Sequence, residues 1–82
     1  MVLVEVYVPG LRKSFDFNLS TNVIIDELID EICLVICQRE QKDVIERKHD
    51  MVLAIEDAEI IMNNRMMLSD YQVKEGMRLI LA

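Results

Sequence analysis

The chain contains few of the residues that break regular structure or bind metals. It has two glycines, one proline, two cysteines and one histidine among 82 residues. So few glycines and prolines leave few places for long irregular loops. The longest uninterrupted apolar run, Ile32 to Cys37, has six residues, whereas a membrane-spanning helix needs roughly 18 or more. We therefore expect a single domain over residues 1–82 with no segment inserted in a membrane.

Basic residues are also scarce. Nine Lys and Arg against fifteen Asp and Glu give a net charge of −6. A field of that sign repels phosphate backbones and anionic lipid surfaces, so nucleic acid is not an expected partner. The first apolar stretch is interrupted by Glu5 and followed by Pro9-Gly10, unlike a secretion signal. These features predict a cytoplasmic protein.

The thiols and the single histidine do not form a recognisable catalytic or metal-binding motif. Cys33 and Cys37 are four residues apart in a predicted helix, a spacing that is unfavourable for a disulfide. Two small apolar groups packed in a reducing compartment are the simpler interpretation. A metal would need two more ligands, and His49 lies on another segment. We expect no enzyme activity, no metal and no cofactor.

Alternating residues predict strands at the beginning of the chain. Four valines at even positions alternate with other residues over Val2–Val8, which is typical of a strand with one buried face. Pro9-Gly10 is a turn signal. A second alternation covers Phe15–Leu19, so the two segments predict an antiparallel hairpin.

A long helix is predicted over residues 22–41. Ser20-Thr21-Asn22 offers three side chains that can cap its N-terminus. Apolar residues at helical spacing form a core stripe, namely Ile25, Leu28, Ile32, Val35 and Ile36. Further apolar residues lie beside that stripe, namely Ile24, Ile29, Cys33, Leu34 and Cys37. This apolar helix flank opens the alternative of a homodimer that packs helix against helix.

The remaining sequence predicts a charged connector over residues 38–50 and three further strands. Strands are expected at 51–56, 59–62 and 77–81, with a helical turn near Ser69-Asp70. The order ββ-α-ββ-β predicts an α+β fold in which one long helix packs across a mixed sheet. The residues expected to be largely buried are Val4, Val6, Phe17, Leu28, Ile32, Leu53 and Leu79.

Residues 68–81, Leu68-Ser69-Asp70-Tyr71-Gln72-Val73-Lys74-Glu75-Gly76-Met77-Arg78-Leu79-Ile80-Leu81, resemble the end of ubiquitin. There a Leu-Ser-Asp-Tyr turn leads through a short link into the closing strand. The resemblance implies the ubiquitin-like β-grasp fold. In the turn itself, Asp70 is expected to cap the backbone N–H groups that follow it, and the Tyr71 hydroxyl is expected to bond to nearby backbone.

Among ubiquitin-like proteins, the chain most resembles the YukD or EsaB family, which accompanies type VII secretion systems of Gram-positive bacteria. The resemblance rests on the Leu-Ser-Asp turn, the link Lys74-Glu75-Gly76 and the Leu-rich end. It implies a cytosolic accessory or regulatory component that acts by contacting proteins. Conjugation in the ubiquitin family uses a Gly-Gly tail, whereas this sequence stops at Ala82, so we expect a non-conjugated protein.

The partner-binding surface is predicted from side-chain parity. If the even valines of the first strand face the helix, the odd residues face outward, and the same argument applies to the third and last strands. The predicted partner-binding residues are Leu3, Tyr7, Val52, Ala54, Ile80 and Ala82. The alternatives are a self-associating structural protein and a β-grasp adaptor unrelated to secretion.

Overall fold

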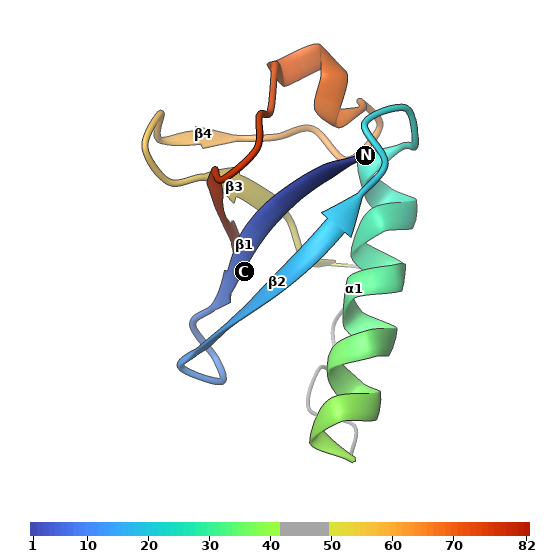
Figure 1. Ribbon diagram of the computed structural model, residues 1–82, viewed down its shortest axis with the longest axis vertical. Coiled ribbons are helices and arrows are strands. Elements are labelled where there is room, and N and C mark those ends of the chain that lie inside the picture. The colour runs from blue at the N-terminus through green and yellow to red at the C-terminus, as the bar shows by residue number, and fades with distance from the viewer. Residues whose placement is uncertain (42–49) are drawn as a thin grey trace.

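The computed structural model describes residues 1–41 and 50–82 (Figure 1). Most of the predicted charged connector, including His49, lies outside the described residues. No helix in the described part of the chain is long and apolar enough to cross a bilayer. The elements in chain order are β1 (Val2–Val8), β2 (Lys13–Leu19), α1 (Ile25–Glu40), β3 (Leu53–Ile55), β4 (Ile60–Ile61), a 3-10 helix (Leu68–Tyr71) and β5 (Arg78–Leu81).

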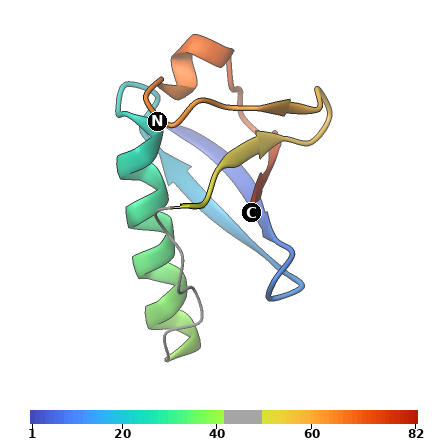
Figure 2. The ribbon, with the colours of Figure 1, turned by 180° about the vertical axis from the view of Figure 1, so that it is seen from behind.

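The strands form one mixed sheet in the order β2-β1-β5-β3-β4. β1 is antiparallel to β2 and parallel to β5, while β3 is antiparallel to both β4 and β5. The long helix α1 packs against one face of this sheet (Figures 1 and 2). The predicted α+β arrangement is therefore confirmed.

The core lies between α1 and the face of the sheet to which the even-numbered valines of β1 point. All four even-numbered valines of β1 are buried, as the alternation predicts. The residues predicted to be buried are buried, except Phe17, which is half-buried. Phe17 lies on β2, an edge strand with a neighbour on only one side, so its ring is covered less completely than that of a central residue.

The predicted apolar helix flank is wrong in two of its residues. Ile29 is 0% and Cys33 3% exposed, so both belong to the core. The core also contains Met62, Leu68 and Val73 from the segment that follows β4, so α1 is covered by more than the sheet. Of the other flank residues, Ile24 and Leu34 are exposed and Cys37 is half-buried. These five residues therefore do not form one open surface for a homodimer.

The start of α1 is held by a distant loop rather than by the predicted side-chain caps. The Ile25 N–H donates to the Met66 carbonyl at 2.8 Å, and the Asp26 N–H donates to the Asn64 carbonyl at 2.9 Å. These bonds satisfy two of the N–H groups that a helix leaves unpaired at its first turn. Ser20 instead accepts a hydrogen bond from the Asn22 N–H at 3.3 Å. The predicted Ser20-Thr21-Asn22 cap is wrong, because main-chain acceptors from elsewhere fill that role.

The 3-10 helix fastens this loop to the rest of the domain. Asp70 Oδ2 accepts from the Met67 N–H at 2.9 Å, and the Tyr71 hydroxyl accepts from the Asn63 N–H at 2.8 Å. The Ser69 N–H donates to the Thr21 carbonyl at 3.1 Å, just before α1. The predicted bond between the Tyr71 hydroxyl and nearby backbone is confirmed, whereas Asp70 caps an N–H group that precedes it and not, as predicted, the N–H groups that follow it.

We predict that Asp70→Ala lowers the free energy of unfolding by about 1 kcal/mol, the usual cost of losing a side-chain cap. The change leaves the Met67 N–H without its acceptor. The matched control is Ser69→Ala, on an exposed neighbour in the same turn, which should change stability by less than about 0.5 kcal/mol. Urea denaturation followed by circular dichroism measures both. Equal losses in the two variants would mean that the Asp70 bond does not stabilise the turn.

Candidate functional site: the outer face of the sheet

A row of apolar side chains crosses the sheet on the face opposite α1. Tyr7 pairs with Ile80, Ile80 with Ala54, and Ala54 with Ile61, so the row spans β1, β5, β3 and β4. Residues paired across strands point to the same face. Their chain neighbours Val6, Leu79 and Ile55 are buried on the core side, which directs this row outward. We call these four residues the outer row.

Ile61 is the most exposed member of the outer row, with 70% of its surface accessible. Tyr7, Ala54 and Ile80 are half-buried between neighbouring strands. Ile61 is not among the residues predicted from the sequence, because Ile60-Ile61-Met62 is apolar throughout and shows no alternation. Knowing that Met62 is buried would have placed Ile61 on the outer face, since adjacent residues in an extended segment point to opposite faces.

Val52 and Ala82 extend the outer row along β3 and β5. Each is two residues from a row member, so it faces the same side. Their main chains exchange two hydrogen bonds, from the Val52 N–H to the Ala82 carbonyl at 2.8 Å and in return at 3.1 Å. Five of the six predicted partner-binding residues therefore lie together with Ile61.

Leu3 is separated from these residues by a row of charged side chains. Arg78 lies between two carboxylates, with its Nε 3.0 Å from Glu5 Oε1 and its Nη1 3.2 Å from Glu56 Oε2. Its guanidinium carbon also lies 4.8 Å from the centre of the Tyr7 ring. Leu3, 42% exposed, lies beyond Glu5 on the same face of β1. The structure therefore does not join Leu3 to the apolar row.

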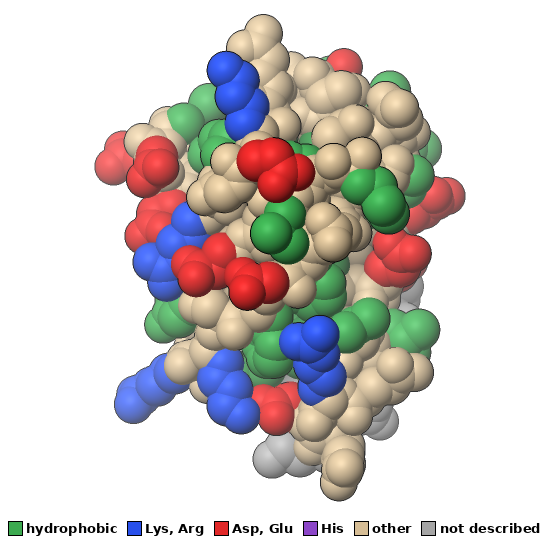
Figure 3. Space-filling view, viewed as in Figure 1, with side chains coloured by type: hydrophobic (Ala, Val, Ile, Leu, Met, Phe, Trp, Pro, Cys, Tyr) green, Lys and Arg blue, Asp and Glu red, His purple; other side chains and the backbone are tan. Residues whose placement is uncertain are grey.

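The charged row stabilises the fold only modestly but shapes the surface. All three of its side chains are partly exposed to solvent, by 39% to 46%, and ion pairs near the surface contribute about 0–1 kcal/mol. Two carboxylates around one guanidinium leave the row with a net negative charge. In the space-filling view, exposed hydrophobic side chains occur as small patches among charged ones (Figure 3). The outer row is thus a narrow apolar strip with an acidic border.

Comparison with known proteins identifies the fold. No family model matches the chain, and no curated protein matches it. Among solved structures, a protein designed on the template of human erythrocytic ubiquitin superposes with a TM-score of 0.71 and 17% sequence identity. The superposition covers 100% of this chain and 90% of the designed protein. The chain has the ubiquitin-like β-grasp fold.

Two natural domains superpose on this β-grasp chain equally well. A ubiquitin-like domain of an Arabidopsis thaliana protein has a TM-score of 0.70 and 20% identity, covering 99% of this chain and 74% of its own. The N-terminal ubiquitin-like domain of a third protein has a TM-score of 0.71 and 16% identity, with coverages of 99% and 72%. These comparisons do not connect the domain with the YukD or EsaB family or with secretion, so that role stays a prediction.

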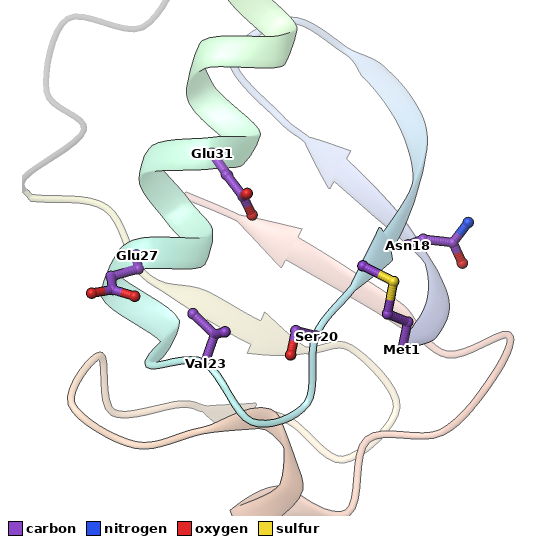
Figure 4. Close-up of a pocket in the computed structure, with 6 residues that line it drawn as sticks. All are labelled: Met1, Asn18, Ser20, Val23, Glu27 and Glu31. Carbon is purple, nitrogen blue, oxygen red and sulfur yellow. The ribbon is translucent and has the colours of Figure 1, made fainter.

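A shallow pocket of about 350 Å³ lies apart from the outer row in the β-grasp domain (Figure 4). It is lined by Met1, Asn18, Ser20, Val23, Glu27 and Glu31, between the end of β2 and the first turns of α1. Its carboxylates lack the further ligands that a metal needs, since the described residues contain no group of three His, Cys, Asp or Glu suited to that role. The outer row remains the candidate functional site.

Proposed function

We propose that this β-grasp domain is a protein-interaction module whose outer row, with Val52 and Ala82, binds a protein partner. The supporting observation is a line of apolar side chains in register across four strands, on the face of the sheet opposite α1. A sheet face that only meets water usually carries polar side chains in those positions. An apolar centre with a polar border is the usual composition of a protein interface.

The chemistry of the border favours a partner with its own apolar ridge and a basic side chain beside it. Arg78 is already neutralised by Glu5 and Glu56, and one carboxylate charge is left over. A partner cation placed there would complete the charge pattern, which contributes to orientation and association rate more than to affinity. Ile61 supplies the protruding apolar contact, because it is the least covered residue of the row.

The specific role that we propose is a cytosolic accessory or regulatory component of a bacterial type VII secretion system. The support is the likeness of residues 68–81 to the small ubiquitin-like proteins of those systems. Deleting the gene in the organism that encodes it should reduce export of the small helical substrates, measured by immunoblotting of culture supernatants. Unchanged export, with the partner still captured by the purified protein, would reject the secretion role and retain the interaction module.

The interaction surface is tested by placing a charge on it. We predict that Ile61→Glu weakens partner capture by about tenfold or more, because the contact would bury an unpaired carboxylate. Folding should be nearly unaffected, since Ile61 is 70% exposed. Ile80→Glu tests the centre of the same row. Quantitative pull-downs from the native host, with thermal melts alongside, measure both effects.

The matched control is Leu34→Glu, which makes the same chemical change at a 60% exposed residue on α1. This variant should capture the partner as the unmodified protein does. If the folded Ile61 and Ile80 variants bind normally while the Leu34 variant does not, the partner site lies on the helix instead.

A further inference from the structure

The two edges of the sheet differ in what they offer to another chain. β4, at one edge, is two residues long, whereas β2, at the other, is seven residues long. A long unpaired edge strand presents a row of N–H and C=O groups that can pair with an added strand. The β2 sequence contains no proline or glycine. It therefore retains every N–H donor and a regular extended backbone.

The peptide groups on the open side of β2 follow from its pairing with β1. Glu5 N–H donates to the Met77 carbonyl and the Leu3 carbonyl accepts from Gly76 N–H, so odd residues of β1 bond toward β5. The even residues of β1 then bond toward β2, and they stand opposite Phe15, Phe17 and Leu19. By the same alternation, the main-chain groups of β2 that point away from β1 belong to Ser14, Asp16 and Asn18.

Two half-buried aromatic rings lie beside this edge on the helix side of the sheet. Phe15 and Phe17 pack against the core with ring centres 6.4 Å apart. The Arg39 guanidinium carbon lies 6.0 Å from the Phe15 ring, which shows that α1 runs next to them. An added strand would project every second side chain over these rings, so aliphatic residues at alternate positions would gain apolar contact there.

The charge beside the edge is negative at the Leu19 end. Glu27 and Glu31 line the pocket there together with Asn18 (Figure 4). Neither glutamate forms an ion pair within the described residues. At the opposite end, Lys13 is already paired with Glu40 at 2.8 Å. A basic side chain in the incoming segment is therefore favoured at the Leu19 end.

We propose that the open edge of β2 binds an extended peptide segment of a protein partner, which adds to the sheet as an antiparallel sixth strand. Aliphatic side chains of the segment lie over Phe15 and Phe17, and a basic side chain lies by Glu27 and Glu31. A second copy of this chain is a poorer occupant, because the register that pairs most residues would place Asp16 opposite its own copy. Antiparallel pairing is also slightly more stable per residue than parallel pairing.

The probe is the acetylated, amidated peptide Lys-Lys-Val-Thr-Val-Thr-Val, whose lysines lie at the Leu19 end when it pairs antiparallel. With the valines over the phenyl rings, its threonine N–H groups face β2. We expect saturable shifts of the Ser14, Asp16 and Asn18 amide signals in NMR titrations, with slower solvent exchange. N-methylation of both threonines should weaken binding by about tenfold or more, whereas N-methylation of two valines should change it by less than about threefold.

Two further comparisons identify the edge and the charge. Asp16→Pro removes an N–H that points away from β1, so the fold should persist while peptide affinity falls; Asp16→Ala keeps the N–H and should bind normally. Replacing both lysines of the probe by glutamate should weaken binding. In the Glu31→Gln variant, the affinities of the lysine and glutamate peptides should differ less than in the unmodified domain. If Asp16→Pro does not fold, the two methylated peptides still decide the question.

The proposal is overturned if the unmodified domain shows no saturable binding of the lysine-valine peptide up to about 1 mM, a weak affinity of about −4 kcal/mol. Equal binding of the threonine-methylated and valine-methylated peptides also overturns it, because main-chain pairing would then play no part. Ile61→Glu should bind the peptide normally, which separates this edge from the outer row.

Discussion

Shortening Ile32 to alanine is expected to lower the free energy of unfolding by about 2–5 kcal/mol, and Leu28→Ala by a similar amount. Both residues are almost completely buried on α1, one helical turn apart. Alanine removes buried methyl groups and leaves a cavity that the packed surroundings fill only partly. Domains of this size are commonly stable by only about 5–15 kcal/mol, so either variant should unfold at markedly lower urea concentration.

The measurement is urea denaturation monitored at the helical circular dichroism band, with the m-value checked for two-state unfolding. Ile32→Val is the graded control and should cost about 0.5–1.5 kcal/mol, because it removes one methylene group. A loss below about 1 kcal/mol for both alanine variants would contradict the assignment of this helix face to the core.

The second large effect separates two aliphatic residues that look alike in the sequence. Ile29 is 0% exposed and Leu34, on the same helix, is 60% exposed. Ile29→Ala should therefore cost about 2–5 kcal/mol, whereas Leu34→Ala should stay within about 0.5 kcal/mol. The same denaturation experiment compares them directly. If Ile29→Ala also lowered the free energy of unfolding by no more than about 0.5 kcal/mol, Ile29 would belong to a surface flank available for self-association.

The strands and the helix could be predicted because their patterns are local. The valines of β1 alternate regardless of what they pack against, and the helical spacing from Ile25 to Ile36 marks a stripe that is buried except at the half-buried Val35. The width of that stripe could not be predicted. Ile29 and Cys33 belong to a core that also contains Met62, Leu68 and Val73 from the segment after β4, and the pattern within the helix does not show how far that core extends.

The errors in the site and at the helix start also come from long-range contacts. The N–H groups of Ile25 and Asp26 bond to carbonyls in a loop far along the chain, so no capping side chain is required nearby. The position of Ile61 in the outer row depends on its pairing with Ala54. Parity placed Leu3 on the correct face, but only the register of Glu5 with Arg78 shows what lies between it and Tyr7.

The position of β5 has a consequence for synthesis of the chain. β5 is the last strand in the sequence, yet it lies between β1 and β3 in the sheet. Until residues 78–81 have been translated, the β1–β2 hairpin and the β3–β4 hairpin have no strand between them, and Leu79 and Leu81 are missing from the core. A product interrupted before Arg78 would carry two hairpins that do not pair into one sheet, and isolated hairpins are marginal in stability. Quality-control proteases should therefore remove such fragments and spare the completed domain.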